Sequence, residues 1–591
     1  MLLQRLSEYA SRIPANEQLP SLYSRKAVRY IVELNMRGEL LTPKLVPTDD
    51  STVRELKYGA VMPVPEVTRS GKVLRPLLLA DYADWTLGVA DEKAAKAGNA
   101  ASRFIAHRDL VRRCAINTNE PSVAAVATFL ERDPLHEIEL PDNFDHTARI
   151  TFRVDLAVFP VSLASVAAFW AEVNDPDADP DKPAPVMQCI VCGERRPVLR
   201  RLKKKIMGVP GAETGGAIIS ANEDAFLSYG LTASLTSPIC AEHAEKFTNA
   251  ANWLLASKQH SVRLGDTAFM FWTREDVPFN GLSFLTRPMI EDVNNLLTAV
   301  KTGQMPTFSA TPFYATALSA SKGRIVIRDW IDTTVGEVQT ILARWFDGQW
   351  IIGHAGDEAT PFGVEALALS MVRARKDLSS TVVRTLVRAA LKGTPLPWSF
   401  LTQAMYRNQV ETRQSAQGQH AAHPRAALIK LILASHGKIK EGTLVQLEPD
   451  ATFTTDRECV AYHCGRLLAA LENLQQAAIP GVSVTVGDRY YGAAAANPAA
   501  TFGRLMQGAK HHQTKVQRDN RGAANRINEL LDEIDSRLTY LPHAFSLEER
   551  GFFGLGFYQQ VAALRAARQE AIERRKARQT ETDSDESGDN A

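Results

Sequence analysis

Two short pairs of potential metal ligands stand out in the sequence. Cys189 and Cys192 form a CxxC pair, and Cys240 and His243 repeat its spacing after residues 193–239. Thiolates and an imidazole in two such pairs are typical ligands of a closed tetrahedral zinc site, with one pair on each of two chain segments. Four protein ligands leave no open coordination position, so a zinc ion here would be structural. The alternative interpretation is a core cysteine and a surface histidine beside an unrelated turn.

A dense basic run lies between the two pairs. Residues 195–205 contain seven Arg and Lys side chains. Like charges at this density repel one another unless a polyanion neutralises them, and each phosphate contact would release condensed counterions. The run therefore favours nucleic-acid binding, and we predict that the contacts are made by Arg200, Arg201, Lys203, Lys204 and Lys205.

The glycine-rich stretch after the run is not a nucleotide-hydrolysing loop. Gly211 and Gly216 have the glycine spacing of a P-loop, but Ala217 and Ile218 occupy the positions of its lysine and its hydroxyl residue. The sequence also lacks an HExxH motif, a nucleophile elbow and a carboxylate cluster for two metal ions. We therefore expect a chain that is not an enzyme and binds no nucleotide.

The same stretch and its neighbours allow further nucleic-acid contacts. Small residues from 208 to 216 would let backbone amides approach a phosphate, or they simply turn the chain. Asn222 offers an amide to a base edge, and we include it among the predicted contacts. Phe226 and Tyr229 are suited to base stacking, but we expect both rings to lie in the core.

Two other basic patches are candidates for the same role. Arg69, Lys72 and Arg75 lie on a proline-bounded loop, for which we predict a nucleic-acid contact. If residues 503–526 form one helix, one of its faces carries a basic stripe suited to the backbone of a single strand. The alternative is a solvated face. The stripe consists of Arg504, His511, Lys515, Arg518 and Arg526.

The composition of the whole chain limits its class. With 591 residues and 45% hydrophobic content, the chain can bury sizeable cores and is expected to form about two to four domains. Its 68 basic and 67 acidic side chains leave a formal charge of +1, so nucleic-acid affinity must come from local clustering. Six cysteines in so long a chain argue against a secreted disulfide scaffold and indicate a cytoplasmic protein.

The order of elements predicts an α+β region followed by helices. Residues 1–364 contain alternating segments such as 266–273 and a hairpin closed at Gly323, which indicate a mixed or antiparallel sheet. Residues 365–560 place apolar side chains at helical spacing and predict an all-α bundle. Residues 561–591 run from a basic helix into an acidic tail that we expect to be disordered.

Many short motifs, in their order along the chain, resemble one protein family. They extend to about residue 560 and include CIVCGE, NAANWLL, VRLGDTAFMFW, GRIVIRDW, DRYYGAAAANPAATF and GFFGLGFYQQ. The family is the large subunit of the subtype I-C CRISPR surveillance complex, Cascade. The resemblance implies a subunit that reads the protospacer-adjacent motif (PAM) in duplex DNA, contacts the 5′ handle of the guide RNA and helps to open the strands. It does not imply the zinc site.

The resemblance also implies partners. These are the guide RNA, the target duplex and its displaced strand, the Cascade backbone and guide-processing subunits, small subunits that resemble this chain's own C-terminal part, and a helicase-nuclease that cuts the DNA. The alternative function is a stand-alone nucleic-acid-processing enzyme, such as a nuclease, with an unrecognised site.

Overall fold

The computed structural model divides into two compact units. The first unit comprises Met1–Ser257 and Ser319–Val326, and the second comprises Lys258–Leu318 and Ile327–Ala591. Among the described residues, no helix has both the length and the apolar character needed to cross a bilayer. The structure describes residues 1–48, 59–67, 69, 74–89, 99–132, 134–142, 144–145, 147–174, 184–221, 223–227, 229–304, 306–411, 416–449 and 453–588.

The first unit is built on a mixed β-sheet. Its N-terminal strands are β1 (Tyr23–Val28), β2 (Tyr30–Leu34), β3 (Val46–Pro47), β4 (Ala60–Pro65), β5 (Ala80–Tyr82) and β6 (Arg149–Val154). The sheet has the order β3-β2-β6-β5, in which β2 and β6 are parallel and the outer strands pair antiparallel. β1 and β4 form a separate antiparallel pair. The mixed sheet predicted from the sequence is confirmed.

Helices complete the core of this sheet. They are α2 (Ala83–Thr86), α4 (Asn99–Thr118), α5 (Pro121–Glu131), α6 (Pro134–Glu137) and α7 (Ala164–Val173). α5 begins at a proline, whose fixed φ and missing N–H suit the first helical position. Val32 and Phe152 of the sheet belong to one buried apolar cluster with Phe129 of α5 and Trp170 of α7. The core therefore lies between the sheet and these helices.

A further helix, α8 (Ala241–Ala256), organises the rest of the first unit. It packs against α1 (Leu2–Tyr9), and the ring centroids of Tyr9 and Trp253 lie 5.7 Å apart. An antiparallel hairpin of β7 (Val186–Gln188) and β8 (Arg195–Pro197) precedes α8 in the chain. α8 begins directly after Cys240, so this helix starts at the second pair of predicted metal ligands.

The second unit begins with a four-stranded sheet. Its strands are β9 (Ser261–Leu264), β10 (Thr267–Thr273), β11 (Pro312–Ser321) and β12 (Arg324–Thr334), in the order β12-β11-β10-β9. β11 and β12 are the hairpin expected from the sequence, and Lys322 and Gly323 at its turn both have positive φ, as a type I′ turn requires. The tip of this hairpin, residues 319–326, belongs to the first unit.

Helices pack on this sheet to form a continuous core. They are α9 (Gly281–Thr286), α10 (Ile290–Thr302), α11 (Val335–Gln349), α12 (Val364–Leu369), α13 (Ser380–Lys392), α14 (Trp398–Val410) and α15 (Ala416–Ser435). Phe269 and Ile331 of the sheet share one buried cluster with Val338 of α11 and Leu386 of α13. The sequence placed the boundary between the α+β region and the helical region at residue 364. Because this sheet and these helices share one core, that boundary falls inside the second unit.

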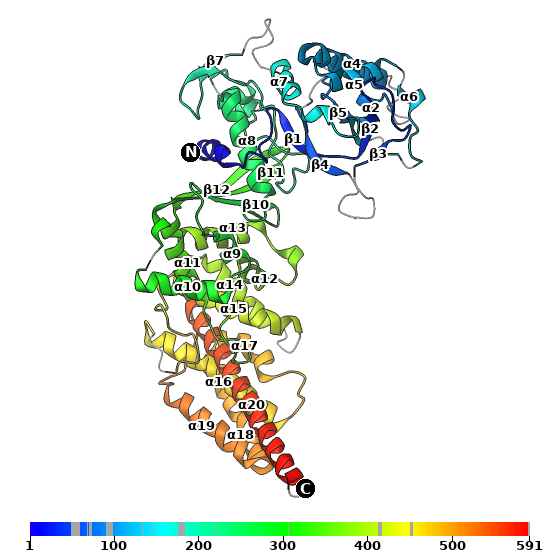
Figure 1. Cartoon of the computed structure of the whole chain (residues 1–591). Coiled ribbons are helices and arrows are strands. Elements are labelled where there is room, and N and C mark those ends of the chain that lie inside the picture. Colours follow the sequence, from blue (N-terminus) through cyan, green and yellow to red (C-terminus); the bar gives the residue numbers. More distant parts are fainter. Residues whose placement is uncertain are drawn as a thin grey trace. The chain divides into compact units, whose positions relative to one another are not determined.

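The predicted C-terminal helical bundle is confirmed. It consists of α16 (Asp456–Ala478), α17 (Val486–Ala496), α18 (Pro498–Asp519), α19 (Arg521–Ser536) and α20 (Leu547–Gly588) (Figure 1). α16 and α20 touch backbone to backbone at two glycines. A Cβ at Gly465 would lie 2.0 Å from the carbonyl oxygen of Phe553, and a Cβ at Gly556 would lie 2.0 Å from that of Tyr462. Only glycine fits at these two positions.

The last helix is longer than the sequence predicted. Its backbone continues as α20 to Gly588, past the basic segment at which we expected the helix to end. The first half of α20 is packed in the bundle and supplies the nucleus that an isolated helix lacks. Helix-forming Ala, Arg, Gln and Glu residues then extend it, with an ion pair between Glu570 and Arg574 one turn apart.

The glycine contact between α16 and α20 predicts a large loss of stability from a small change. Gly556→Ala should lower the free energy of unfolding of the second unit by about 2–4 kcal/mol, because the added methyl group meets the backbone of α16. Gly508→Ala is the matched control. Gly508 lies inside α18 with open space where its Cβ would be, so alanine should stabilise the helix by about 0.5–1 kcal/mol. Denaturant unfolding of both variants measures the difference, and equal effects would contradict this packing.

Candidate metal centre and nucleic-acid interface

The first pair of thiols lies on the tight turn between β7 and β8. The amide of Cys189 donates to the carbonyl of Glu194 at 2.9 Å, and the amide of Gly193 donates to the carbonyl of Cys189 at 2.8 Å. Gly193 has a φ of +77°, a conformation that favours glycine. These bonds fold the CxxC segment back on itself, so that Cys189 and Cys192 point to the same side.

The second pair comes from the start of α8. Cys240 is the residue before the first helical position, and His243 follows in the first turn. Two backbone hydrogen bonds hold this segment against the β7–β8 turn, from the Ile190 amide to the Pro238 carbonyl at 3.0 Å and from the Leu199 amide to the Ile239 carbonyl at 2.9 Å. The two chain segments are therefore fixed side by side.

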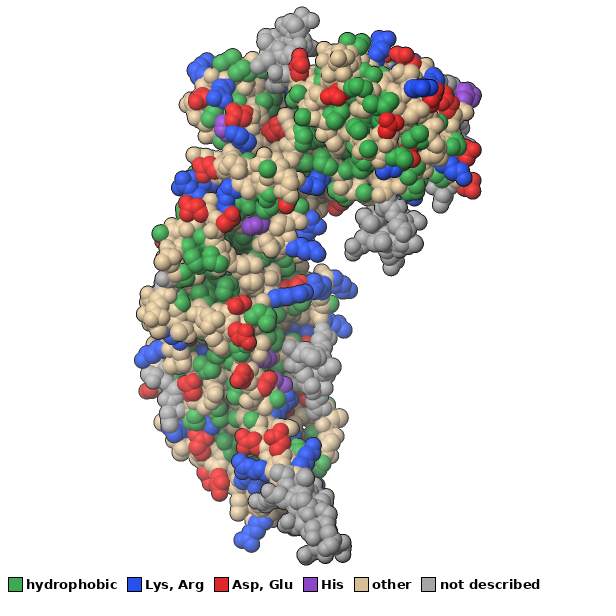
Figure 2. Space-filling view, viewed as in Figure 1, with side chains coloured by type: hydrophobic (Ala, Val, Ile, Leu, Met, Phe, Trp, Pro, Cys, Tyr) green, Lys and Arg blue, Asp and Glu red, His purple; other side chains and the backbone are tan. Residues whose placement is uncertain are grey.

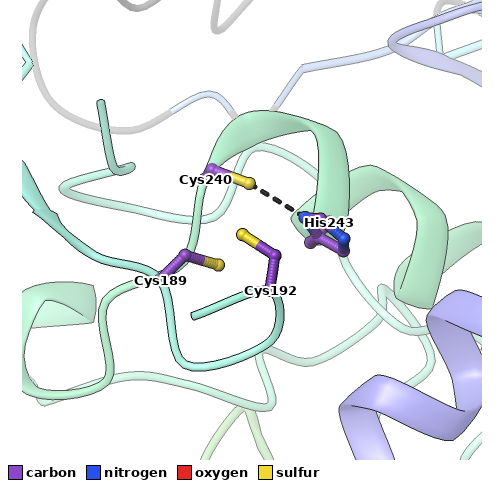
Figure 3. Close-up of side chains that lie close together, drawn as sticks. All are labelled: Cys189, Cys192, Cys240 and His243. Atoms are coloured by element: carbon purple, nitrogen blue, oxygen red, sulfur yellow. Dashed lines mark hydrogen bonds between the residues drawn. The ribbon is translucent and has the colours of Figure 1, made fainter. Parts of the chain in front are cut away.

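The four side chains form one compact cluster that could hold a metal ion (Figure 3). Their ligand atoms all lie within 4.8 Å of one another, and Cys240 Sγ lies 3.0 Å from His243 Nδ1. With ordinary zinc–ligand bond lengths, the edges of a tetrahedral site measure about 3.4–3.8 Å. Cys189 and Cys240 are buried. The structure therefore confirms that the sequence pairs Cys189–Cys192 and Cys240–His243 meet in space.

The thiols of the cluster differ in acidity. Burial acts to raise the pKa of Cys189, but hydrogen bonds from backbone amides, including that of Cys192, outweigh it and lower the pKa below its usual value. Burial, together with the neighbouring thiols, raises the pKa of Cys240 to about 11. In the absence of a bound cation, the Cys240 thiol therefore stays protonated at neutral pH.

The basic run between the ligand pairs divides into paired and exposed side chains. Arg196 forms ion pairs with Glu194 at 2.5 Å and with Glu242 of α8 at 2.9 Å. Lys203 and Lys205 are half-buried. The exposed basic side chains of the run are Arg195, Arg200 and Arg201.

Lys204 is buried, which corrects its prediction as a phosphate contact. Its ammonium donates to Glu245 of α8 at 2.8 Å and to Asn249 at 3.1 Å. Glu245 also accepts hydrogen bonds from the Ser21 hydroxyl and from the Leu22 amide. Burial would raise the pKa of Glu245, but the Lys204 ammonium and these hydrogen bonds hold it below its usual value. Lys204 therefore fastens the run to α8.

The glycine-rich stretch serves packing. A Cβ at Gly216 would lie 2.7 Å from the Ile325 side chain, and one at Gly215 would lie 2.4 Å from the sulfur of Met207. The amide of Gly216 donates to the carbonyl of Ile206 at 2.9 Å. This amide is therefore occupied inside the fold, and these two glycines let the chain pass close to its neighbours.

The two aromatic residues after the glycines are not in the core. Phe226 is 45% exposed and Tyr229 is 98% exposed, which corrects the sequence expectation. Phe226 has a partner on the β11–β12 hairpin tip. The guanidinium of Arg324 lies 4.5 Å from the centroid of its ring and stacks on it. Sequence reasoning missed Arg324, since no local pattern links a residue so far along the chain to this segment. Asn222 lies outside the described residues.

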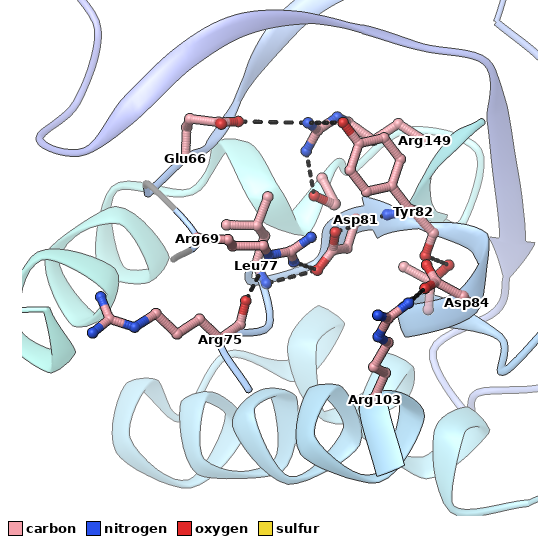
Figure 4. A network of polar contacts seen from close by, with 11 residues as sticks. Glu66, Arg69, Arg75, Leu77, Asp81, Tyr82, Asp84, Arg103 and Arg149 are labelled. Atoms are coloured by element: carbon pink, nitrogen blue, oxygen red, sulfur yellow. Dashed lines mark hydrogen bonds and ion pairs between the residues drawn. The ribbon is translucent and has the colours of Figure 1, made fainter. Parts of the chain in front are cut away.

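Arg69 is held in a polar network (Figure 4). Its guanidinium pairs with the fully buried carboxylate of Asp81 and donates to the carbonyl of Arg75 at 2.8 Å. It also lies 4.2 Å from the ring centroid of Trp85. Two of its donor groups therefore fix the start of the loop, and the role of Arg69 in nucleic-acid binding stays a prediction.

The other loop residues differ from Arg69. Arg75 is exposed, and Figure 4 shows its side chain pointing away from the network. Lys72 lies outside the described residues. Of the predicted loop contacts that the structure describes, Arg75 is thus the one available at the surface, and its role in binding stays a prediction.

The predicted basic stripe lies on two helices. α18 ends at Asp519 and α19 begins at Arg521, and the Asn520 side chain caps α19 by accepting from the Ala523 amide at 3.0 Å. This corrects the assumption of a single helix, because the cap ends one helix and begins the next. Gln513 donates to Asn528 across the pair at 3.2 Å. All five predicted residues are exposed, with Arg504, His511, Lys515 and Arg518 on α18 and Arg526 on α19.

Charge on the visible surface is mixed. Figure 2 shows one face of the molecule, on which basic and acidic side chains are interspersed. This agrees with the formal charge of +1 and with ion pairs such as Arg518–Asp519 at 2.9 Å. The predicted nucleic-acid binding would therefore depend on local groups of unpaired cations.

The burial of Lys204 predicts that this residue stabilises the fold, whereas the exposed Arg201 does not. Lys204→Ala should lower the free energy of unfolding of the first unit by about 2–4 kcal/mol at neutral pH, because the half-buried Glu245 then loses its cation. Lys204→Met keeps the side-chain stem and should destabilise for the same reason. Arg201→Ala, the exposed control, should change stability by less than about 0.5 kcal/mol. Urea unfolding followed by tryptophan fluorescence tests this, and a harmless Lys204→Met would contradict it.

Comparison with known proteins places the chain in a family. Residues 6–565 match the family described as CRISPR-associated protein (Cas_Csd1), a range that contains the metal-ligand cluster, the basic run, the Arg69 network and α16 to α19. No curated protein is significantly similar to the chain. The match covers nearly the whole sequence, and the chain therefore belongs to the CRISPR-associated protein family Cas_Csd1.

Proposed function

We propose that this chain is the non-catalytic large subunit of a type I-C CRISPR RNA-guided DNA surveillance complex, Cascade. In this role it recognises the PAM, contacts the 5′ handle of the guide RNA, promotes strand opening and recruits a helicase-nuclease. The observation that carries the proposal is the family match over residues 6–565, to which the subtype I-C motifs in the sequence add the subunit and its role.

The surface of the basic run supports nucleic-acid binding. Arg195, Arg200 and Arg201 are exposed on a run that begins just after the Cys189–Cys192 pair and whose end is fixed to α8 by Lys204. A fixed row of cations can meet phosphates without first ordering a loop, which reduces the entropy lost on binding. The exposed basic face of α18 supports a second contact, with the displaced strand.

The competing function, a stand-alone nuclease, has less support. Within the described residues, the one group of three or more potential metal ligands is the Cys189, Cys192, Cys240 and His243 cluster. Four protein ligands leave no open position at which a metal ion could activate water. We therefore favour recognition by this chain and cleavage by a partner.

The assembled complex tests the proposal. Replacing Arg200 and Arg201 with alanine should weaken DNA binding for all sequences and reduce the slope of log K against log salt by about one unit per lost phosphate contact. PAM preference should persist, and magnesium or manganese should produce no cutting until the helicase-nuclease is added.

The matched control replaces Arg344 and Arg375, two exposed arginines of the second unit, with alanine. It should leave the salt slope unchanged. If the Arg200/Arg201 variant has the same salt slope as the wild type, these arginines make contacts with protein and not with phosphate. Cutting by the chain alone that disappears on a point mutation within it would favour the nuclease.

We also propose that the cluster of three thiols and one imidazole binds a structural zinc ion. The supporting observations are the burial of Cys189 and Cys240, the mutual distances within 4.8 Å and the origin of the ligands from two segments that backbone hydrogen bonds already join. A zinc ion bound here would link the β7–β8 turn to α8 and so stabilise the basic run between them.

Metal analysis tests the zinc site. The chain purified without chelators should contain about one zinc ion, and Cys189→Ser should lose it and destabilise the first unit, because metal binding is coupled to folding. Cys459→Ser, in α16, is the control and should retain the metal. A chain without stoichiometric metal would contradict the proposal.

A further inference from the structure

Residues 223–227 and 229–230 include an exposed aromatic side chain that the contacts of the fold do not explain. Tyr229 is 98% exposed, the largest fraction among the exposed large hydrophobic side chains that the structure describes. Phe226 and Leu227 in the same segment are 45% and 38% exposed. Three large side chains close together in water indicate a contact surface, since isolated exposed residues are common but grouped ones are not.

The backbone holds Tyr229 in an unusual conformation. Tyr229 has a φ of 52° and Gly230 a φ of 70°, both in the left-handed region, which a bulky residue rarely adopts. A short 3-10 turn over Asp224–Phe226 comes just before, closed by a hydrogen bond from the Leu227 amide to the Asp224 carbonyl at 3.1 Å. A strained backbone at an exposed bulky residue often accompanies a functional contact, so this conformation adds to the case for a contact at Tyr229.

Cations lie beside this segment. Arg324 stacks on Phe226 at 4.5 Å, and Lys322 is exposed two residues earlier on the hairpin tip. On the other side, the Ser234 amide donates to the Arg200 carbonyl at 3.1 Å, which brings the exposed Arg200 and Arg201 close to the end of the segment.

The segment itself carries two exposed carboxylates, Glu223 and Asp224. These would repel a phosphate placed directly on the segment. The suitable ligand therefore has a flat apolar face for the ring and anionic groups displaced toward the arginines. An unpaired nucleotide has this form, with the base on one side of the sugar and the phosphates on the other.

We infer that Tyr229 is a stacking platform for an unpaired nucleobase, with Arg200 and Arg201 neutralising the adjacent phosphates. The inference rests on the proposed function and adds the ligand group that this surface takes, a base outside a double helix. Arg324 stacked on Phe226 keeps the segment in place and leaves the Tyr229 ring free. Because every base has a π face, the contact is tolerant of sequence.

Binding of short oligonucleotides to the full-length chain tests the inference. The probes are a single strand that contains one 2-aminopurine and a matched duplex. Tyr229→Ala should weaken binding of the single strand by about 5- to 100-fold and abolish quenching of the 2-aminopurine fluorescence. Tyr229→Trp should restore both. Duplex binding and the salt slope should not change, because no phosphate contact is lost.

Tyr406→Ala is the matched control, since Tyr406 is a 56% exposed tyrosine of the second unit. It should bind like the wild type. If the wild-type chain binds neither probe, the proposed function fails. If it binds but Tyr229→Ala retains affinity and quenching, or weakens both probes equally, the stacking inference alone is overturned. Unchanged affinity would then assign the surface to a protein partner.

Discussion

One face of α8 holds the basic run of the first unit in place. Side chains spaced three or four residues apart on a helix share a face, and four on α8 contact the run or the residues just after it. Two carboxylates neutralise Arg196 and Lys204, and two amides bond Lys204 and the backbone of residues 205–207. The four are Glu242, Glu245, Asn249 and Asn252. The start of the same helix supplies Cys240 and His243, so the predicted metal ligands and the charge pairing depend on one element.

This arrangement explains how seven cations fit in so short a segment. Repulsion falls because α8 neutralises the inward side chains, and the remaining arginines point to solvent. The division also separates two tasks. Paired cations position the backbone, and exposed ones stay available for a polyanion. Arg69 and Arg75 repeat the division on a separate loop, where Asp81 and Trp85 bind Arg69 and leave Arg75 at the surface.

The bundle depends on a different constraint, which is the lack of a side chain at two glycines. Gly465 and Gly556 let α16 and α20 approach until each helix meets the other's carbonyl groups. A buried polar group then fixes the register. Arg466 is 1% exposed and donates to Glu533 of α19 at 2.6 Å and to Gln560 of α20 at 2.9 Å. With α16, α19 and α20 locked together, α18 can present its basic residues from a rigid support.

The sequence by itself determined the features that follow from local spacing. Period-two and period-3.6 patterns identified the hairpin that turns at Gly323 and the helices of the bundle, because these depend on neighbours in the chain. The repeated spacing of Cys189–Cys192 and Cys240–His243 identified the cluster, because a metal site constrains residue type as well as position. The family followed from many such motifs in order.

Only the tertiary structure decided which charges and rings face water. The sequence of a basic run does not show which of its lysines are buried. Lys204 is buried because it pairs with Glu245, a residue distant in the sequence. Tyr229 is 98% exposed, and Phe226 in the same segment meets Arg324 of a hairpin tip far along the chain. Asn520 ends one helix by capping the next, which splits a stripe that a simple helical pattern would join. Each of these outcomes depends on a partner or a backbone angle that residue type alone does not specify.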